Sequence, residues 1–326
     1  MKLIKILLVI VLIIVSLVVI GLLLLQSVAK QQANTYYNHT NPVGIIEKKY
    51  APMGSSEVAH KEIVSDNPKI GKFVIYYPNE LTETTNKIPV VLWANGTGSN
   101  SETYKSFLTH LASWGFIAVS NDDENTRTGE SLNTSIEVLL KENENHDSPF
   151  YQKVDLDNVG IGGHSQGGVA VFNMATVQPH AEMIKTVYAV SATSSYHTNV
   201  FQDGWQYTIS KVKVPTFLTA GAGAFDAGTA TSADQKSDEK AGIMQGITPL
   251  WSLEENFNLL TDVDKVYVRK TNVDHGDSYL QFDAYMTAWF RYYLMKDQEA
   301  GKAFFGENPE LSTNDNYQDF KAFSQE

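Results

Sequence analysis

The strongest constraint on the fold of this chain is the pentapeptide GHSQG at residues 163–167. It follows a short apolar run at residues 159–162 and precedes a segment of helical character that begins with small residues. This order predicts a strand, a sharp turn and a helix, with Ser165 at the apex of the turn. The flanking glycines leave room for strand and helix to approach, because they carry no side chain. A G-x-S-x-G match also arises by chance, so the surrounding sequence has to decide its meaning.

Apolar runs of strand length alternate with segments of helical spacing along most of the chain. Expected strands are residues 57–64, 72–77, 88–94, 116–120, 158–162, 186–190, 216–220 and 265–269. Expected helices are residues 101–114, 130–140, 166–177 and 278–295. Strands that alternate with helices predict an α/β fold, with a mainly parallel central sheet and helices on both faces.

The first 25 residues predict a membrane anchor ahead of this domain. Residues 6–25 are apolar except for Ser16 and Gly21, and a helix of about twenty apolar residues spans a bilayer. Lys2 and Lys5 favour the cytoplasmic side, which places the rest of the chain outside the cell membrane. The alternative is a signal peptide cleaved near Ala29, which gives a secreted protein. The length of the apolar run favours the uncleaved transmembrane helix.

The rest of the chain divides into three expected parts. Residues 26–49 are polar without sustained periodicity and predict a tether. Residues 50–305 form the folded domain, and residues 306–326 form a C-terminal tail. We expect the tail to be loose beyond the contacts of Phe304 and Phe305.

Composition narrows the partners and the chemistry. The net charge is −12, so nucleic acid is not an expected partner. We expect the protein to contact the lipid bilayer only through the N-terminal helix. The chain has no cysteine, which excludes disulfides, thiol catalysis and thiolate metal sites. It shows no metal-ligand spacing and no G-x-G-x-x-G loop, so neither a metal nor a cofactor is expected.

A serine hydroxyl is a poor nucleophile until a base removes its proton and an acid orients that base. Of the eight histidines, His275 alone follows a late strand, residues 265–269, in a loop before the last long helix. The acid should follow the strand at residues 216–220, where Asp226 comes after a run of small residues. The order Ser165, Asp226, His275 is that of a serine triad built on an α/β sheet.

Two backbone N–H groups should stabilise the negative charge that develops on a substrate carbonyl. One belongs to Gln166, directly after Ser165. The other is expected from the loop after the strand at residues 88–94, where Thr97 is the predicted donor and Gly96 permits a close approach.

Loops around this turn carry aromatic side chains, which predict an apolar acyl or aromatic group in the substrate. The aromatic residues are Tyr104, Tyr196, Trp205 and Phe225, and we expect Tyr196, Phe225 and Gly96 to contact the substrate. The stretch at residues 227–248 is polar and long for a plain connection. It is either a flap over the site or a solvent-exposed loop.

With these parts placed, the chain resembles the α/β-hydrolase superfamily. Within it, the chain is similar to dienelactone-hydrolase-like enzymes, bacterial cutinases and polyester hydrolases, and chlorophyllase-like proteins. The similarity extends over residues 50–305 and rests on residues 90–98, 111–120, 159–168 and 214–220 and on the aspartate and histidine loops. It implies hydrolysis of carboxylic esters, small or lipid-like, through an acyl-enzyme, with Ser165 as nucleophile, His275 as base and Asp226 as the residue that orients the base.

Two positions differ from the pattern of the polyester hydrolases. Those enzymes usually carry an aromatic residue where this chain has Thr97 and methionine where it has Gln166, and Tyr196 is the counterpart of their aromatic wall. Two other functions stay open: a non-catalytic binding protein at the cell surface, and acyl transfer or peptide cleavage by the same triad.

Overall fold

The computed structural model describes Ser16 and residues 40–201, 203–229 and 245–325. The predicted membrane helix at residues 6–25 lies outside the described residues except for Ser16, as does most of the stretch at residues 227–248. In the part that is described, no helix is long and apolar enough to cross a membrane.

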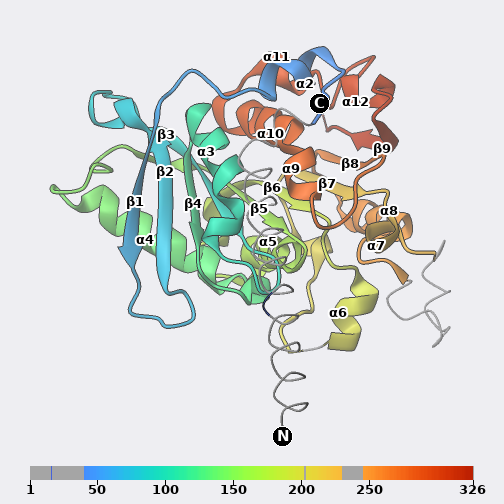
Figure 1. The fold of residues 1–326 in the computed structure, drawn as a ribbon, viewed down its shortest axis with the longest axis horizontal. Coiled ribbons are helices and arrows are strands. Elements are labelled where there is room, and N and C mark those ends of the chain that lie inside the picture. The colour runs from blue at the N-terminus through green and yellow to red at the C-terminus, as the bar shows by residue number, and fades with distance from the viewer. Residues whose placement is uncertain (1–15, 17–39, 202, 230–244, 326) are drawn as a thin grey trace, which may run out of the picture.

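One sheet runs through the described part of the chain, and its nine strands lie in the order β1-β2-β4-β3-β5-β6-β7-β8-β9 (Figure 1). The strands are β1 (Val58–Val64), β2 (Lys72–Pro78), β3 (Ile88–Ala94), β4 (Ile117–Asn121), β5 (Val154–His164), β6 (Ile184–Val190), β7 (Thr216–Gly221), β8 (Lys265–Lys270) and β9 (Tyr317–Phe323). Neighbours from β4 to β8 are parallel, whereas the pairs β1–β2, β2–β4 and β8–β9 are antiparallel. The predicted α/β fold with a mainly parallel sheet is confirmed.

Helices cover both faces of this sheet. They are α2 (Ile45–Tyr50), α3 (Lys105–Ser113), α4 (Glu130–Glu144), α5 (Gln166–Val177), α6 (Ser195–Phe201), α7 (Ala224–Ala227), α8 (Leu250–Leu259), α9 (Ser278–Gln281), α10 (Asp283–Met295), α11 (Gln298–Gly301) and α12 (Glu310–Thr313). The expected helix at residues 278–295 is two helices that meet at Phe282. Helices α2, α6, α7, α8, α11 and α12 were not predicted.

Strand β3 shows how the two faces build separate cores. Side chains alternate across a strand, so Val91 and Trp93 join the cluster that contains residues of α2, α3 and α10. Val90 and Leu92 point the other way, into the cluster that contains residues of α4, α5 and α8. The near-continuous apolar sequence of this strand follows from burial on both faces.

The C-terminal segment is not loose, and the expectation for residues after 305 was wrong. Strand β9 pairs with β8 and covers the edge that β8 would otherwise expose. Its apolar residues do not alternate regularly, because the register shifts within the pairing and Asp319 adopts φ +59°. This bulge hides the period of two by which strands are recognised in a sequence.

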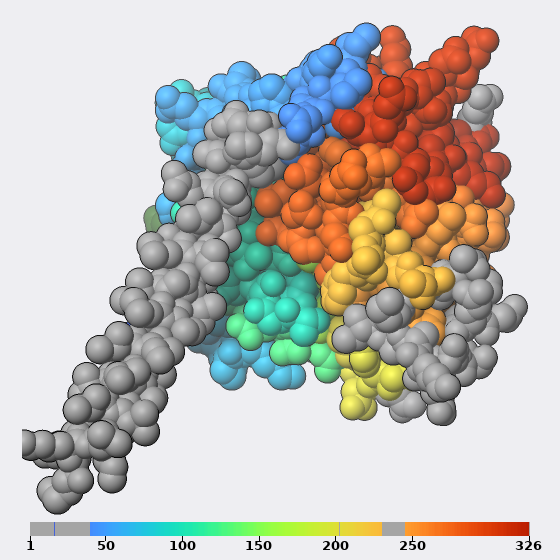
Figure 2. All heavy atoms as spheres, turned by 45° about the vertical axis from the view of Figure 1, so that its right-hand side comes forward, coloured from blue at the N-terminus to red at the C-terminus, as the bar shows by residue number. Residues whose placement is uncertain are grey.

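Helix α2 belongs to the folded body, although the predicted tether included it. Two backbone N–H groups at its start, those of Ile46 and Glu47, bond to the carboxylate of Glu310 at 2.7 and 2.9 Å. The buried Glu47 carboxylate accepts the hydroxyl of Tyr317 at 2.7 Å and lies 3.4 Å from the ammonium of Lys270. Figure 2 shows the blue α2 and the red C-terminal elements meeting at the upper edge of the molecule. Long-range polar contacts of this kind leave no local sequence signal.

A buried ion pair joins α3 to α10. Nδ1 of His110 lies 2.8 Å from the carboxylate of Asp283, and both side chains are buried. Burial by itself would lower the pKa of His110, but the charge of Asp283 and hydrogen bonds to Asp283 and to the Pro52 carbonyl raise the pKa above its ordinary 6.5.

This ion pair predicts how stability depends on pH. The folded protein binds the His110 proton more tightly than the unfolded chain does, so the contribution is complete below about pH 6.5 and is lost as the pH rises through the raised pKa. We expect the Tm of the wild type to fall over this range more than that of the double variant His110→Gln/Asp283→Asn, which replaces the ion pair with neutral amides. Thermal unfolding from about pH 5 to about pH 9 measures the difference. Parallel curves would contradict the assignment.

Candidate active site

The turn between β5 and α5 places Ser165 in a strained conformation, with φ 57° and ψ −116°. Such a turn exposes the serine hydroxyl at the start of a helix. A Cβ on Gly163 would lie 2.1 Å from the carbonyl oxygen of Gly167, and one on Gly167 would lie 2.0 Å from that of Ala94. Both glycines of the pentapeptide are therefore required sterically.

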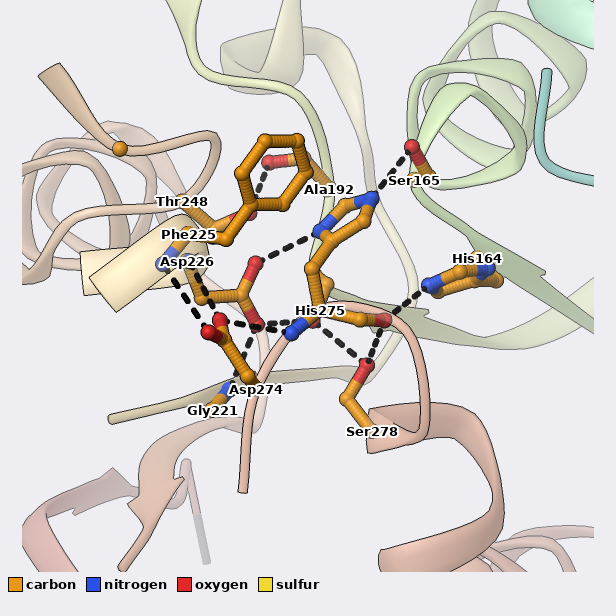
Figure 3. A network of polar contacts seen from close by, with 12 residues as sticks. His164, Ser165, Ala192, Gly221, Phe225, Asp226, Thr248, Asp274, His275 and Ser278 are labelled. Atoms are coloured by element: carbon orange, nitrogen blue, oxygen red, sulfur yellow. Dashed lines mark hydrogen bonds and ion pairs between the residues drawn. The ribbon is translucent and has the colours of Figure 1, made fainter. Parts of the chain in front are cut away.

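Three predicted residues meet at this turn (Figure 3). Nε2 of His275 lies 2.9 Å from Oγ of Ser165, and Nδ1 of His275 lies 2.7 Å from Oδ1 of Asp226. Asp226 is in α7 after β7, and His275 is in the loop after β8. The residues are far apart in sequence, but the carboxyl ends of parallel strands lie at one edge of the sheet, and ligand sites form there.

Asp226 is fully buried, and its charge is balanced by hydrogen bonds. Its second oxygen, Oδ2, accepts the Ser191 hydroxyl at 2.5 Å and the Gly221 N–H at 2.8 Å. A buried carboxylate requires such donors, because an unpaired charge in a core is costly. The same bonds fix the plane of the carboxylate that faces His275.

Asp274 has a part in the site that sequence reasoning missed. Its Oδ1 accepts the backbone N–H groups of Asp226 and His275, each at 2.8 Å, and its Oδ2 accepts that of Phe225 at 3.1 Å. Burial alone would raise the pKa of Asp274, but these three donors and the nearby His275 lower it. Asp274 thus ties the acid segment to the base loop while remaining ionised. Its position directly before His275 was the only available sequence signal.

The two predicted oxyanion donors lie next to Ser165. Among the described residues, neither the backbone N–H of Thr97 nor that of Gln166 donates a hydrogen bond. The N–H of Gly96 is already bonded to the Tyr104 hydroxyl at 2.8 Å. The side-chain amide of Gln166 donates to the Thr97 hydroxyl at 3.1 Å and joins the two donor residues. The arrangement leaves two backbone donors open to a ligand.

A cleft of about 620 Å³ opens over Ser165 and His275. Gly96 and Thr97 line one part of it, and an apolar wall is formed by Phe201, Trp205, Phe225 and Ile247. The ring of Phe225 stands 5.3 Å from that of His275 (Figure 3). Trp205 packs on Phe201 at 5.1 Å and under the guanidinium of Arg127 at 5.7 Å.

Tyr196 does not line this cleft, which corrects its prediction as a substrate contact. Residues 195–201 form helix α6, and the position of Tyr196 on that helix turns its ring toward His197. Phe201, five residues later on the same helix, lines the apolar wall instead. Of the described residues, no group of three or more histidine, cysteine, aspartate or glutamate side chains could hold a metal ion.

Comparison with known proteins gives an independent result. A model of the PET hydrolase-like family matches residues 30–322. Cutinase est1 of Thermobifida alba is 23% identical over 278 residues, which are 82% of this chain and 79% of that protein. Cutinase 2 of Thermobifida cellulosilytica is 23% identical over 192 residues, which are 57% of this chain and 65% of that protein. Uncharacterized protein YcjY of Escherichia coli (strain K12) is 26% identical over 176 residues, 49% of this chain and 53% of that protein.

Proposed function

Because the chain belongs to the PET hydrolase-like family and is thereby a carboxylic ester hydrolase, we propose that it cleaves its substrate through an acyl-enzyme formed on Ser165. The observation that carries this proposal is the continuous set of hydrogen bonds from Ser165 through His275, which both line the cleft, to the buried Asp226. Each contact has the length of a hydrogen bond suited to proton transfer.

The proposed steps follow from the acceptors and donors around His275. Asp226 accepts a hydrogen bond from the Nδ1–H of His275, which leaves Nε2 free to accept the Ser165 proton. As Oγ attacks the ester carbon, His275 becomes protonated and then passes its proton to the leaving alcohol. In the second step, His275 takes a proton from water as the water attacks the acyl carbon. The proton then passes to Oγ of Ser165, the bond between Oγ and the acyl group breaks, and the acid is released.

The negative carbonyl oxygen formed in both steps would lie against the open N–H groups of Thr97 and Gln166. Gln166 is also the first residue of α5, so the positive end of that helix faces the same position. These two sources of positive potential act only where charge develops, which is the requirement for a lower barrier.

The wall of the cleft supports an ester with an apolar or aromatic group beside the scissile bond. Phe201, Trp205 and Phe225 offer aromatic faces, and contact with such faces favours flat or aliphatic groups over charged ones. Two of the similar proteins carry the name cutinase, which is consistent with this substrate class. A non-catalytic binding role does not require the base to lie within hydrogen-bond reach of both partners, so the hydrogen-bonded triad favours catalysis.

Ester panels and a covalent probe test the proposal. The purified protein should hydrolyse p-nitrophenyl esters, with a preference among graded acyl lengths that reports the size of the cleft. It should also bind one fluorophosphonate per chain, and His275→Ala should slow that labelling. An added alcohol or amine acceptor separates hydrolysis from acyl transfer through product analysis. Absence of both turnover and labelling in the folded wild type would refute the proposal.

A further inference from the structure

A buried series of hydrogen bonds, the relay, passes behind Ser165 and connects the two loops that flank it. The Gly96 N–H lies 2.8 Å from the Tyr104 hydroxyl, that hydroxyl lies 3.1 Å from Nδ1 of His164, and Nε2 of His164 lies 2.9 Å from the His275 carbonyl oxygen. We propose that Tyr104 and His164 are positioning residues. They hold the oxyanion loop (residues 95–99) and the base loop (residues 271–277) at a fixed position relative to each other. This role rests on the proposed function.

The direction of every bond in this relay is determined by its two ends. The His275 carbonyl can only accept, so Nε2 of His164 carries the proton. Nδ1 of the neutral His164 ring therefore accepts the phenol proton of Tyr104, and the Tyr104 oxygen accepts the Gly96 N–H, which can only donate. One tautomer of His164 therefore satisfies all four groups, and bonds aligned in one direction polarise one another.

Burial keeps both side chains of the relay neutral. Desolvation, with a smaller contribution from the nearby His275, lowers the pKa of His164 to about 3. Desolvation also raises the pKa of Tyr104, against weaker opposing effects of its hydrogen bonds. The His164 ring lies 4.9 Å from that of His275, yet it cannot compete for the proton that His275 takes from Ser165. The relay thus keeps its direction while His275 is charged.

The relay also determines where the Thr97 N–H points. Gly96 is held on both sides, since its N–H donates to Tyr104 and its carbonyl accepts the Ser99 N–H at 3.1 Å. The Thr97 N–H belongs to the same planar peptide as the Gly96 carbonyl and points in the opposite direction. A Cβ on Gly96 would lie 3.0 Å from the Tyr104 hydroxyl and 3.2 Å from Nδ1 of His164, closer than side chains normally approach. Glycine permits this contact with little strain.

At its other end the relay restrains the base. The His275 carbonyl accepts His164 Nε2–H and the Ser278 hydroxyl, the latter at 3.1 Å (Figure 3). This fixes the backbone from which the His275 ring projects toward Ser165. Loss of the relay should therefore make the positions of the Thr97 N–H and of the His275 ring less well fixed, while the cleft wall stays in place.

A single hydroxyl tests the relay, because Tyr104→Phe keeps the ring and removes the bonds to Gly96 and His164. We expect kcat for ester hydrolysis to fall by about 10- to 100-fold, the effect of a small misplacement of reacting groups, with KM within about twofold of the wild type. Tyr279→Phe is the matched control. The Tyr279 ring packs 5.0 Å from Tyr104 and 5.1 Å from His164, and its hydroxyl makes no hydrogen bond with the described residues.

A second variant separates positioning from general destabilisation. His164→Phe breaks the same relay, so the double variant Tyr104→Phe/His164→Phe should lose no more kcat than the worse single variant. Rates are referred to active sites counted by fluorophosphonate titration, and Tm is measured for each protein. Equal kcat in Tyr104→Phe and Tyr279→Phe, or multiplying losses in the double variant, would overturn the relay alone. An inactive wild type would overturn the proposed function, and the relay with it.

Discussion

Replacing Ser165 with alanine is expected to lower kcat for ester hydrolysis by about 10⁶-fold, as loss of the nucleophile does in other serine triads. The variant retains the cleft, the open N–H groups of Thr97 and Gln166 and the bond between His275 and Asp226, but it has no oxygen that can form an acyl-enzyme. The variant should therefore still bind the substrate, while turnover is lost. The measurement is steady-state hydrolysis of the best ester in the panel, with fluorophosphonate labelling as a second readout.

Ser194→Ala provides a matched serine deletion near the cleft. The Ser194 hydroxyl is buried and has no hydrogen-bond partner in the described part of the chain. Its removal should leave kcat near that of the wild type. Labelling that persists in Ser165→Ala and disappears in Ser194→Ala would assign the nucleophile elsewhere.

Replacing Asp226 with asparagine is expected to lower kcat by about 10⁴-fold, the size seen when the triad acid of another serine enzyme becomes an amide. Asp226 accepts from three donors: the His275 ring, the Gly221 N–H and the Ser191 hydroxyl. An amide has one oxygen, and the rigid Gly221 N–H requires it. The NH₂ group then faces Nδ1 of His275 and forces the ring proton onto Nε2, where it blocks acceptance of the Ser165 proton.

Asp262→Asn is the control for the loss of one negative charge. Asp262 is exposed and has φ +57°, a conformation that asparagine tolerates. The kcat and Tm of the Asp262→Asn variant should match those of the wild type. Fluorophosphonate labelling of Asp226→Asn should be slow but complete, because the nucleophile is still present. A kcat within tenfold of the wild type, in a protein of unchanged fold, would show that the acid lies elsewhere.

Much of the fold was predictable because it depends on patterns that neighbouring residues carry. A strand buried on both faces, such as β3, has a nearly continuous apolar sequence, and the amphipathic helices have their own spacing. The G-x-S-x-G turn marks a point where sterics allow only glycine two residues before and two residues after the serine, so local sequence and local geometry coincide. Where a bulge interrupts the alternation, as at Asp319 in β9, the same reasoning fails.

The cleft wall shows a different kind of failure. Tyr196 and Phe201 are both aromatic and both belong to α6, but the rotation of that helix against the body determines which ring faces Ser165. That rotation depends on contacts with distant segments, such as the bond between His197 and the Gly246 carbonyl at 2.9 Å. No pattern within the helix encodes it.

The sequence by itself determined the mainly parallel α/β sheet, the serine turn and the order of the proposed nucleophile, acid and base along the chain. Only the tertiary structure decided that Asp274 ties the acid segment to the base loop, that Phe201 rather than Tyr196 lines the cleft, and that Tyr104 and His164 join the two loops beside Ser165. The physical reason is the separation along the chain over which each interaction acts. Periodicity and turn preference act between neighbours, whereas hydrogen bonds between side chains 49 or 60 residues apart depend on how the whole sheet brings its strand ends together.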